Sequence, residues 1–60
     1  MRAQDIEIQA RQLHERMGER AIAAAARRAV TAEGKGEAEE AHMWRCVEER
    51  LKEMRGPRQG

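Results

Sequence analysis

The stretch MGERAIAAAARRAV, residues 17–30, decides how this chain folds. It joins a glycine, which adopts backbone angles that other residues avoid, to a run rich in alanine, the best helix former. A helix with so little side-chain volume lets a neighbouring helix approach closely. The stretch is therefore either two helices divided at Gly18 or part of one long helix, and each alternative leads to a different fold.

The apolar residues on the two sides of Gly18 favour the division. Before it, one stripe at helical spacing is formed by Ile6, Ala10, Leu13 and Met17. After it, a second stripe is formed by Ile22, Ala25, Ala26 and Ala29. With about 100° of rotation per residue, the second stripe is turned by roughly 120° from the first, so a straight helix would have to bury two different faces. A break at Gly18 lets both stripes face one core.

The last part of the chain has clear helix boundaries. Gly34-Lys35-Gly36 predicts a turn, and Gly56-Pro57 predicts a stop, because a glycine cap is followed by a residue that cannot continue the helix. Between these boundaries, intervals of three, four and three residues give a heptad-like seam of Trp44, Val47, Leu51 and Met54.

We therefore predict an all-α fold, a single small helical domain over residues 1–57 followed by a disordered tail over 58–60. Its three helices are expected at about residues 4–17, 20–34 and 37–55. The alternative is a two-helix hairpin whose long first helix is kinked at Gly18.

The alanine-rich segment is interpreted as the close-packed middle element, whose methyl groups leave space for Leu13 and Trp44 to cover. The alternative is plain helix filler. The residues expected to form the packing and interaction surfaces are Leu13, Met17, Ile22, Ala25, Ala26, Ala29, Met43, Trp44, Val47, Leu51 and Met54.

Length and composition indicate a protein that works with a partner. A chain of 60 residues builds only a thin core, so pairing with itself, as a homodimer, or docking on a larger protein is expected. One cysteine, Cys46, excludes an intrachain disulfide and favours a cytoplasmic setting. The sequence has no apolar run of membrane-spanning length and no signal-peptide core, so no membrane partner is expected. The net charge of +1 argues against nucleic acid as the partner.

The order of these features resembles a group of short, uncharacterised bacterial helical proteins. Their pattern is a glycine after the first helix, an alanine-rich second helix containing Arg-Ala, a glycine turn and Trp-Arg in the last helix. The matching positions are Gly18, Ala21, Ala25, Ala26, Arg28, Ala29, Gly36, Ala41, Trp44 and Arg45. The group often has a proline at the start of the second helix, where this chain has Ile22. The resemblance implies the helical fold and supplies no function.

No catalytic residue, cofactor or metal site is expected. Glu39 and His42 have the spacing of half a ferritin-like di-iron site, and His42 and Cys46 are four residues apart, as in a two-ligand metal edge. The helical wheel places all three on the solvent side of the last helix, with no inward-facing glutamates in the first helix to complete a centre. His14 and Glu15 are adjacent, point about 100° apart, and have no nucleophile beside them.

The function predicted from the sequence is a non-catalytic helical protein–protein interaction module, either self-associating or an accessory subunit of a larger bacterial assembly. Two alternatives stay open. One is a small nucleic-acid-associated regulator, and the other is a metal-binding helical protein that uses Glu39 and His42.

Overall fold

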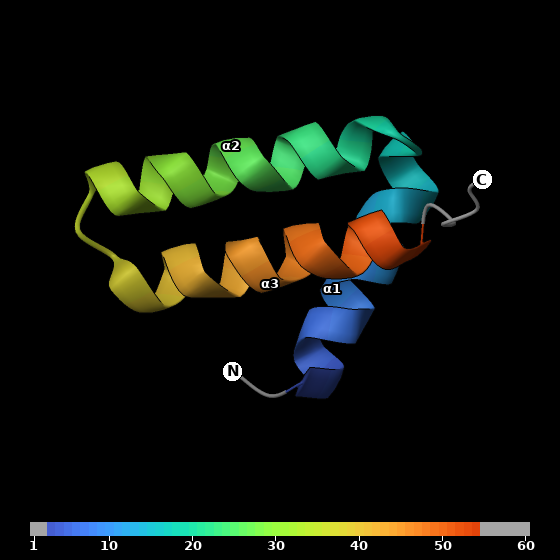
Figure 1. Cartoon of the computed structure of the whole chain (residues 1–60), viewed down its shortest axis with the longest axis horizontal. Coiled ribbons are helices and arrows are strands. Elements are labelled where there is room, and N and C mark those ends of the chain that lie inside the picture. Colours follow the sequence, from blue (N-terminus) through green and yellow to red (C-terminus); the bar gives the residue numbers. More distant parts are fainter. Residues whose placement is uncertain (1–2, 55–60) are drawn as a thin grey trace.

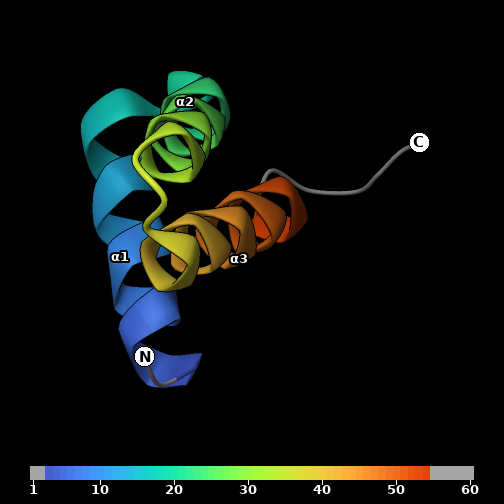
Figure 2. The ribbon, with the colours of Figure 1, turned by 90° about the vertical axis from the view of Figure 1, so that its left-hand side faces the viewer.

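The computed structural model describes residues 3–54, and they form three α-helices. α1 spans Ala3–Met17, α2 spans Arg20–Gly34 and α3 spans Ala38–Met54. α2 and α3 lie side by side in opposite directions (Figure 1), and α1 crosses one side of this pair at a steep angle (Figure 2). The predicted all-α, three-helix fold is confirmed. The predicted helix end at residue 55, the Gly56-Pro57 stop and the tail over 58–60 lie outside the described residues.

Gly18 separates α1 from α2. Its φ of 62° lies in the left-handed region, which costs a residue with a side chain about 1–2 kcal/mol. Its amide donates to the His14 carbonyl at 2.7 Å, which ends α1, and its own carbonyl accepts from the Ala21 amide at 3.1 Å. Two residues thus suffice to turn the chain sharply, and the two-helix alternative with a continuous first helix is excluded.

A second glycine, Gly36, ends α2. Its φ is 77°, its amide donates to the Glu33 carbonyl at 3.1 Å, and the Glu37 amide donates to the Ala32 carbonyl at 2.9 Å. This pair of hydrogen bonds is the Schellman motif, which satisfies carbonyl groups that the end of a helix leaves open. The Glu37 carbonyl then accepts from the Ala41 amide at 2.9 Å, so α3 begins at once and runs back along α2.

The three helices contribute unequal side-chain volume to the core. α2 contributes mainly methyl groups, from the buried Ala21, Ala25, Ala29 and Ala32. We call these four residues the alanine seam. α3 contributes the large side chains that fill the space next to the seam, and α1 adds a small patch. The residues buried from these two helices are Ala10, Leu13, Ala41, Met43, Trp44, Val47 and Leu51.

The structure corrects the predicted stripe on the second helix. Ala25 and Ala29 of that stripe are fully buried, whereas Ile22 and Ala26 are half-buried, and Ala21 and Ala32 complete the seam in their place. The reason is steric, because only the smaller alanine fits where α3 crosses most closely, and Ile22 is displaced to the flank of the core. Met17 was expected in the core and is 36% exposed, because the chain leaves α1 for the turn at Gly18 directly after it. Met54 is half-buried against the core.

The positive φ of Gly18 predicts the effect of adding a methyl group there. Gly18→Ala is expected to lower the free energy of unfolding by about 1 kcal/mol or more, since a Cβ at this position meets no atom within 4 Å and the cost is purely conformational. Gly34→Ala is the matched control, because Gly34 is equally uncrowded and lies within α2. It should raise the free energy of unfolding by about 0.5–1 kcal/mol. Chemical denaturation measures both, and a stabilised Gly18→Ala chain would contradict this account of the turn.

Candidate interaction surfaces

The outer side of α2 carries an apolar band of Ile22, Ala26 and Val30. Each of these residues follows a member of the alanine seam, so the band lies about 100° around the helix from the seam. Ile22 and Ala26 are half-buried, and Val30 is 56% exposed. From Ala21 to Val30, the seam and the band together make α2 apolar over an arc of roughly 180°, of which α3 covers only a part. The exposed Glu33, in the last turn, lies on the same arc.

A basic cluster of Arg27, Arg28 and Lys35 lies around one hollow on another side of α2 and at its end. The Arg28 guanidinium stands 5.0 Å from the centre of the Trp44 ring, and the Trp44 indole nitrogen donates to Glu40 at 3.4 Å. The only aromatic ring of the chain is therefore covered by a cation and anchored at its polar end. An open hollow at this place is lined by Arg27, Arg28, Thr31, Ala32, Lys35, Glu37, Glu40 and Trp44.

An acidic stripe on α3 is formed by Glu39, His42, Cys46, Glu49 and Glu53. It runs beside the crossing of α1, because Ile6 of α1 lines the hollows next to these residues. All five lie within an arc of roughly 80° on the helix. His42 is exposed and Cys46 is half-buried, and the Cys46 Sγ lies 3.6 Å from the His42 Nε2. Within residues 3–54, no three histidine, cysteine, aspartate or glutamate side chains converge on a point where they could hold a metal ion.

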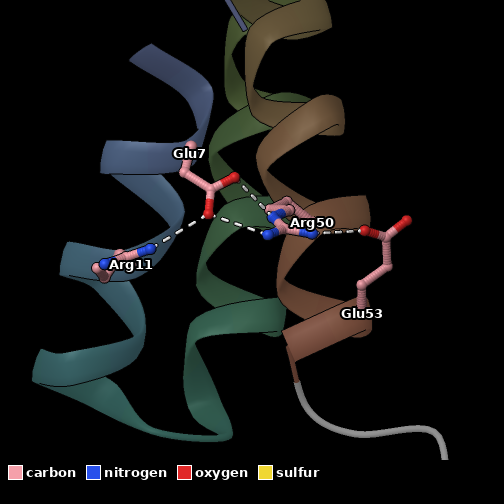
Figure 3. Close-up of polar contacts among 4 residues, drawn as sticks. All are labelled: Glu7, Arg11, Arg50 and Glu53. Carbon is pink, nitrogen blue, oxygen red and sulfur yellow. Dashed lines mark hydrogen bonds and ion pairs between the residues drawn. The ribbon is translucent and has the colours of Figure 1, made fainter. Parts of the chain in front are cut away.

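A polar network fixes α1 across α3. The Arg50 Nη2 donates to one carboxylate oxygen of Glu7 at 2.9 Å, and its Nε lies 2.9 Å from the other. Arg11 approaches the same carboxylate from within α1 at 3.3 Å, and the Arg50 Nη1 donates to Glu53 at 2.9 Å (Figure 3). The contact joins α1 to α3 beside the buried Ala10 and Leu13, and it favours the observed crossing because a planar guanidinium facing a carboxylate restricts both position and orientation. The hydrogen bond from Arg50 holds the pKa of the Glu7 carboxyl below its ordinary value, against the opposing effect of partial desolvation.

A second set of ion pairs connects α2 and α3. Arg45 lies 3.5 Å from Glu33 of α2 and 3.3 Å from Glu48, whose carboxylate is also 3.6 Å from Lys52. The Glu48–Lys52 pair follows directly from the spacing of four residues in one helix. The contacts of Arg28 with Trp44 and of Glu7 with Arg50 join different helices, and no spacing rule reveals them.

The Cys46–His42 contact brings a thiol within 3.6 Å of an imidazole, so a nucleophile and a base lie side by side on α3. His14, expected at the surface beside Glu15, is exposed on α1. In the part of the chain that the structure describes, no helix is long and apolar enough to cross a membrane. These surfaces offer helix packing and ion pairing, together with the thiol–imidazole pair of Cys46 and His42.

Comparison with known proteins adds no relative. No family model, curated protein or solved structure matches this chain. The resemblance to short bacterial helical proteins stays a prediction.

The lowered pKa of Glu7 predicts how stability depends on pH. Because the folded-state pKa is below that of the unfolded chain, the Glu7–Arg50 contact stabilises the fold at neutral pH and is lost as the pH falls through the folded-state pKa. Glu7→Gln should therefore flatten the loss of stability below about pH 5. Thermal melts across this range measure the slope. A double-mutant cycle with Arg50→Gln should give a favourable coupling at neutral pH that disappears in acid, and a coupling that does not change with pH would contradict the assignment.

Proposed function

We propose that this chain is a non-catalytic helical interaction module whose apolar band, Ile22, Ala26 and Val30, receives a helix of a partner. The leading partner is a second copy of the chain, and the other is a larger protein on which the chain sits as an accessory subunit. The observation that carries the proposal is the apolar arc of α2, which extends well beyond the part that α3 covers.

The side-chain sizes in the band support a helix as the occupant. Ala26 stands between two branched residues at intervals of four, so a second helix can lie in the low point between Ile22 and Val30. The alanine seam receives α3 in a comparable way, with small side chains on one helix and large ones on the other. Such a contact would also stabilise the fold, because the core of one chain is thin. It would bury the apolar surface of Val30, which one chain leaves exposed to water.

Two exposed apolar residues allow a matched test of the band. Val30 is 56% exposed on the band and Ile8 is 50% exposed on α1, so a glutamate at either position costs the single chain little. Val30→Glu should abolish self-association, and Ile8→Glu should leave it intact. Sedimentation equilibrium gives the mass, and the melting temperature of the parent chain should rise with its concentration.

Equal loss of association in both variants would contradict a role for the band. A parent chain that stays monomeric at micromolar concentrations, with a melting temperature independent of concentration, would exclude the homodimer. The proposal would then require a larger protein as the partner. Val30→Glu should abolish binding to that protein, and Ile8→Glu should preserve it.

A nucleic-acid-associated regulator is the second candidate, and the basic cluster is the observation that favours it. Arg27, Arg28 and Lys35 surround one hollow, where phosphate groups would be drawn to them. Glu37 and Glu40 line the same hollow, and Arg28 covers the Trp44 ring that would otherwise stack on a base. Binding to duplex DNA that weakens steeply with salt, and that Arg27→Gln reduces, would favour this candidate over the first.

A further inference from the structure

The His42–Cys46 pair on the acidic stripe of α3 has the geometry of a metal-binding edge. The two residues are one helical turn apart, and the Cys46 Sγ and the His42 Nε2 lie 3.6 Å from each other. In a tetrahedral zinc site the metal is about 2.3 Å from sulfur and about 2.0–2.1 Å from nitrogen, which places two such ligands about 3.6 Å apart. The separation of the two ligand atoms is therefore compatible with one zinc-type ion bound by both.

We propose that His42 and Cys46 chelate a thiophilic divalent ion of the zinc class, and that the same two residues of a second copy complete the tetrahedron. The described residues of one chain offer no third ligand at this point, whereas such an ion takes four. Two copies supply two sulfur and two nitrogen ligands, a set typical of structural zinc. Two thiols bind the ion as thiolates and release two protons, so the charge of the ion is balanced and affinity rises with pH.

The charges around the pair favour a cation and oppose pairing without one. Glu39 and Glu49 lie on the same stripe, and both are exposed. They attract a divalent ion to the surface of one chain, and they repel the equivalent stripe of a second chain. Glu53, also on the stripe, is partly balanced by Arg50 at 2.9 Å. Association through α3 is therefore expected only when the ion is present.

This pairing is independent of the apolar band, because the band lies on α2 and the chelate lies on α3. The Val30→Glu chain removes the proposed α2 contact and keeps both ligands. Failure of one proposal is thus distinguishable from failure of the other.

Cobalt(II) is the probe, with the protein kept reduced and the Val30→Glu chain as the background. Titration should give the thiolate-to-cobalt charge-transfer band and the intense d–d bands of tetrahedral coordination, saturating at one ion for two chains. Zinc should displace cobalt, and sedimentation should show a doubling of mass that a chelator reverses. Cys46→Ser and His42→Gln should each weaken binding by at least about 100-fold, more than the loss of an outer-sphere partner costs.

His14→Gln is the matched control, because it removes the other histidine, exposed on α1, and should leave spectrum and stoichiometry unchanged. Glu39→Gln should also leave the d–d bands unchanged, since Glu39 is not a ligand in this arrangement. Circular dichroism of each variant verifies that the helices are intact, as expected for substitutions at exposed or half-buried positions. Saturation at one ion per chain with no change in mass, or tetrahedral bands that persist in Cys46→Ser, would overturn the proposal.

Discussion

The contact between the alanine seam of α2 and the large side chains of α3 is the constraint on which the rest of the structure depends. Ala21, Ala25 and Ala29 are fully buried although their side chains hold almost no volume. They are buried because Trp44, Val47 and Leu51 of α3 pack against them. These large side chains fit there because the alanine side chains of the seam are small. The short turns at Gly18 and Gly36 make this contact possible. Gly18 ends α1 just before the seam begins, and Gly36 reverses the chain so that α3 runs back along the seam.

Much of this fold is predictable from the sequence, for identifiable reasons. Glycines at 18 and 36 mark the two turns because each takes a positive φ, and the seam of Trp44, Val47 and Leu51 on α3 is marked by large residues at helical spacing. The phase of α2 is not predictable in the same way. Alanine fits any side of a helix, so only Ile22 and Val30 carry a signal, and it is misleading because both lie outside the seam. The crossing of α1 includes the contact of Glu7 with Arg50, which are far apart in the chain and meet only after folding.

The candidate surfaces follow from the same division of volume. Because α3 needs only a narrow flat seam, the neighbouring band on α2 remains partly in solvent and is suited to a further helix. Because the large apolar residues of α3 are directed at the core, another side of the helix, which borders α1, carries glutamates, His42 and Cys46. The sequence marks His42 and Cys46 as a possible ligand pair by their spacing, and the 3.6 Å separation of their ligand atoms is what the structure adds. The band is suited to an apolar partner surface, and the acidic stripe is suited to a cation.

The most direct test of the central claim is a leucine scan of α2, read as the free energy of unfolding by chemical denaturation. If the seam is the close contact between α2 and α3, leucine at Ala21, Ala25 or Ala29 should overpack it and cost about 1–3 kcal/mol. Leucine at Ala23, which is exposed, should be nearly neutral because both residues are good helix formers. Losses that recur every four residues along the seam are the predicted result. A flat profile across all the positions would contradict the account and reduce the alanine run to helix filler.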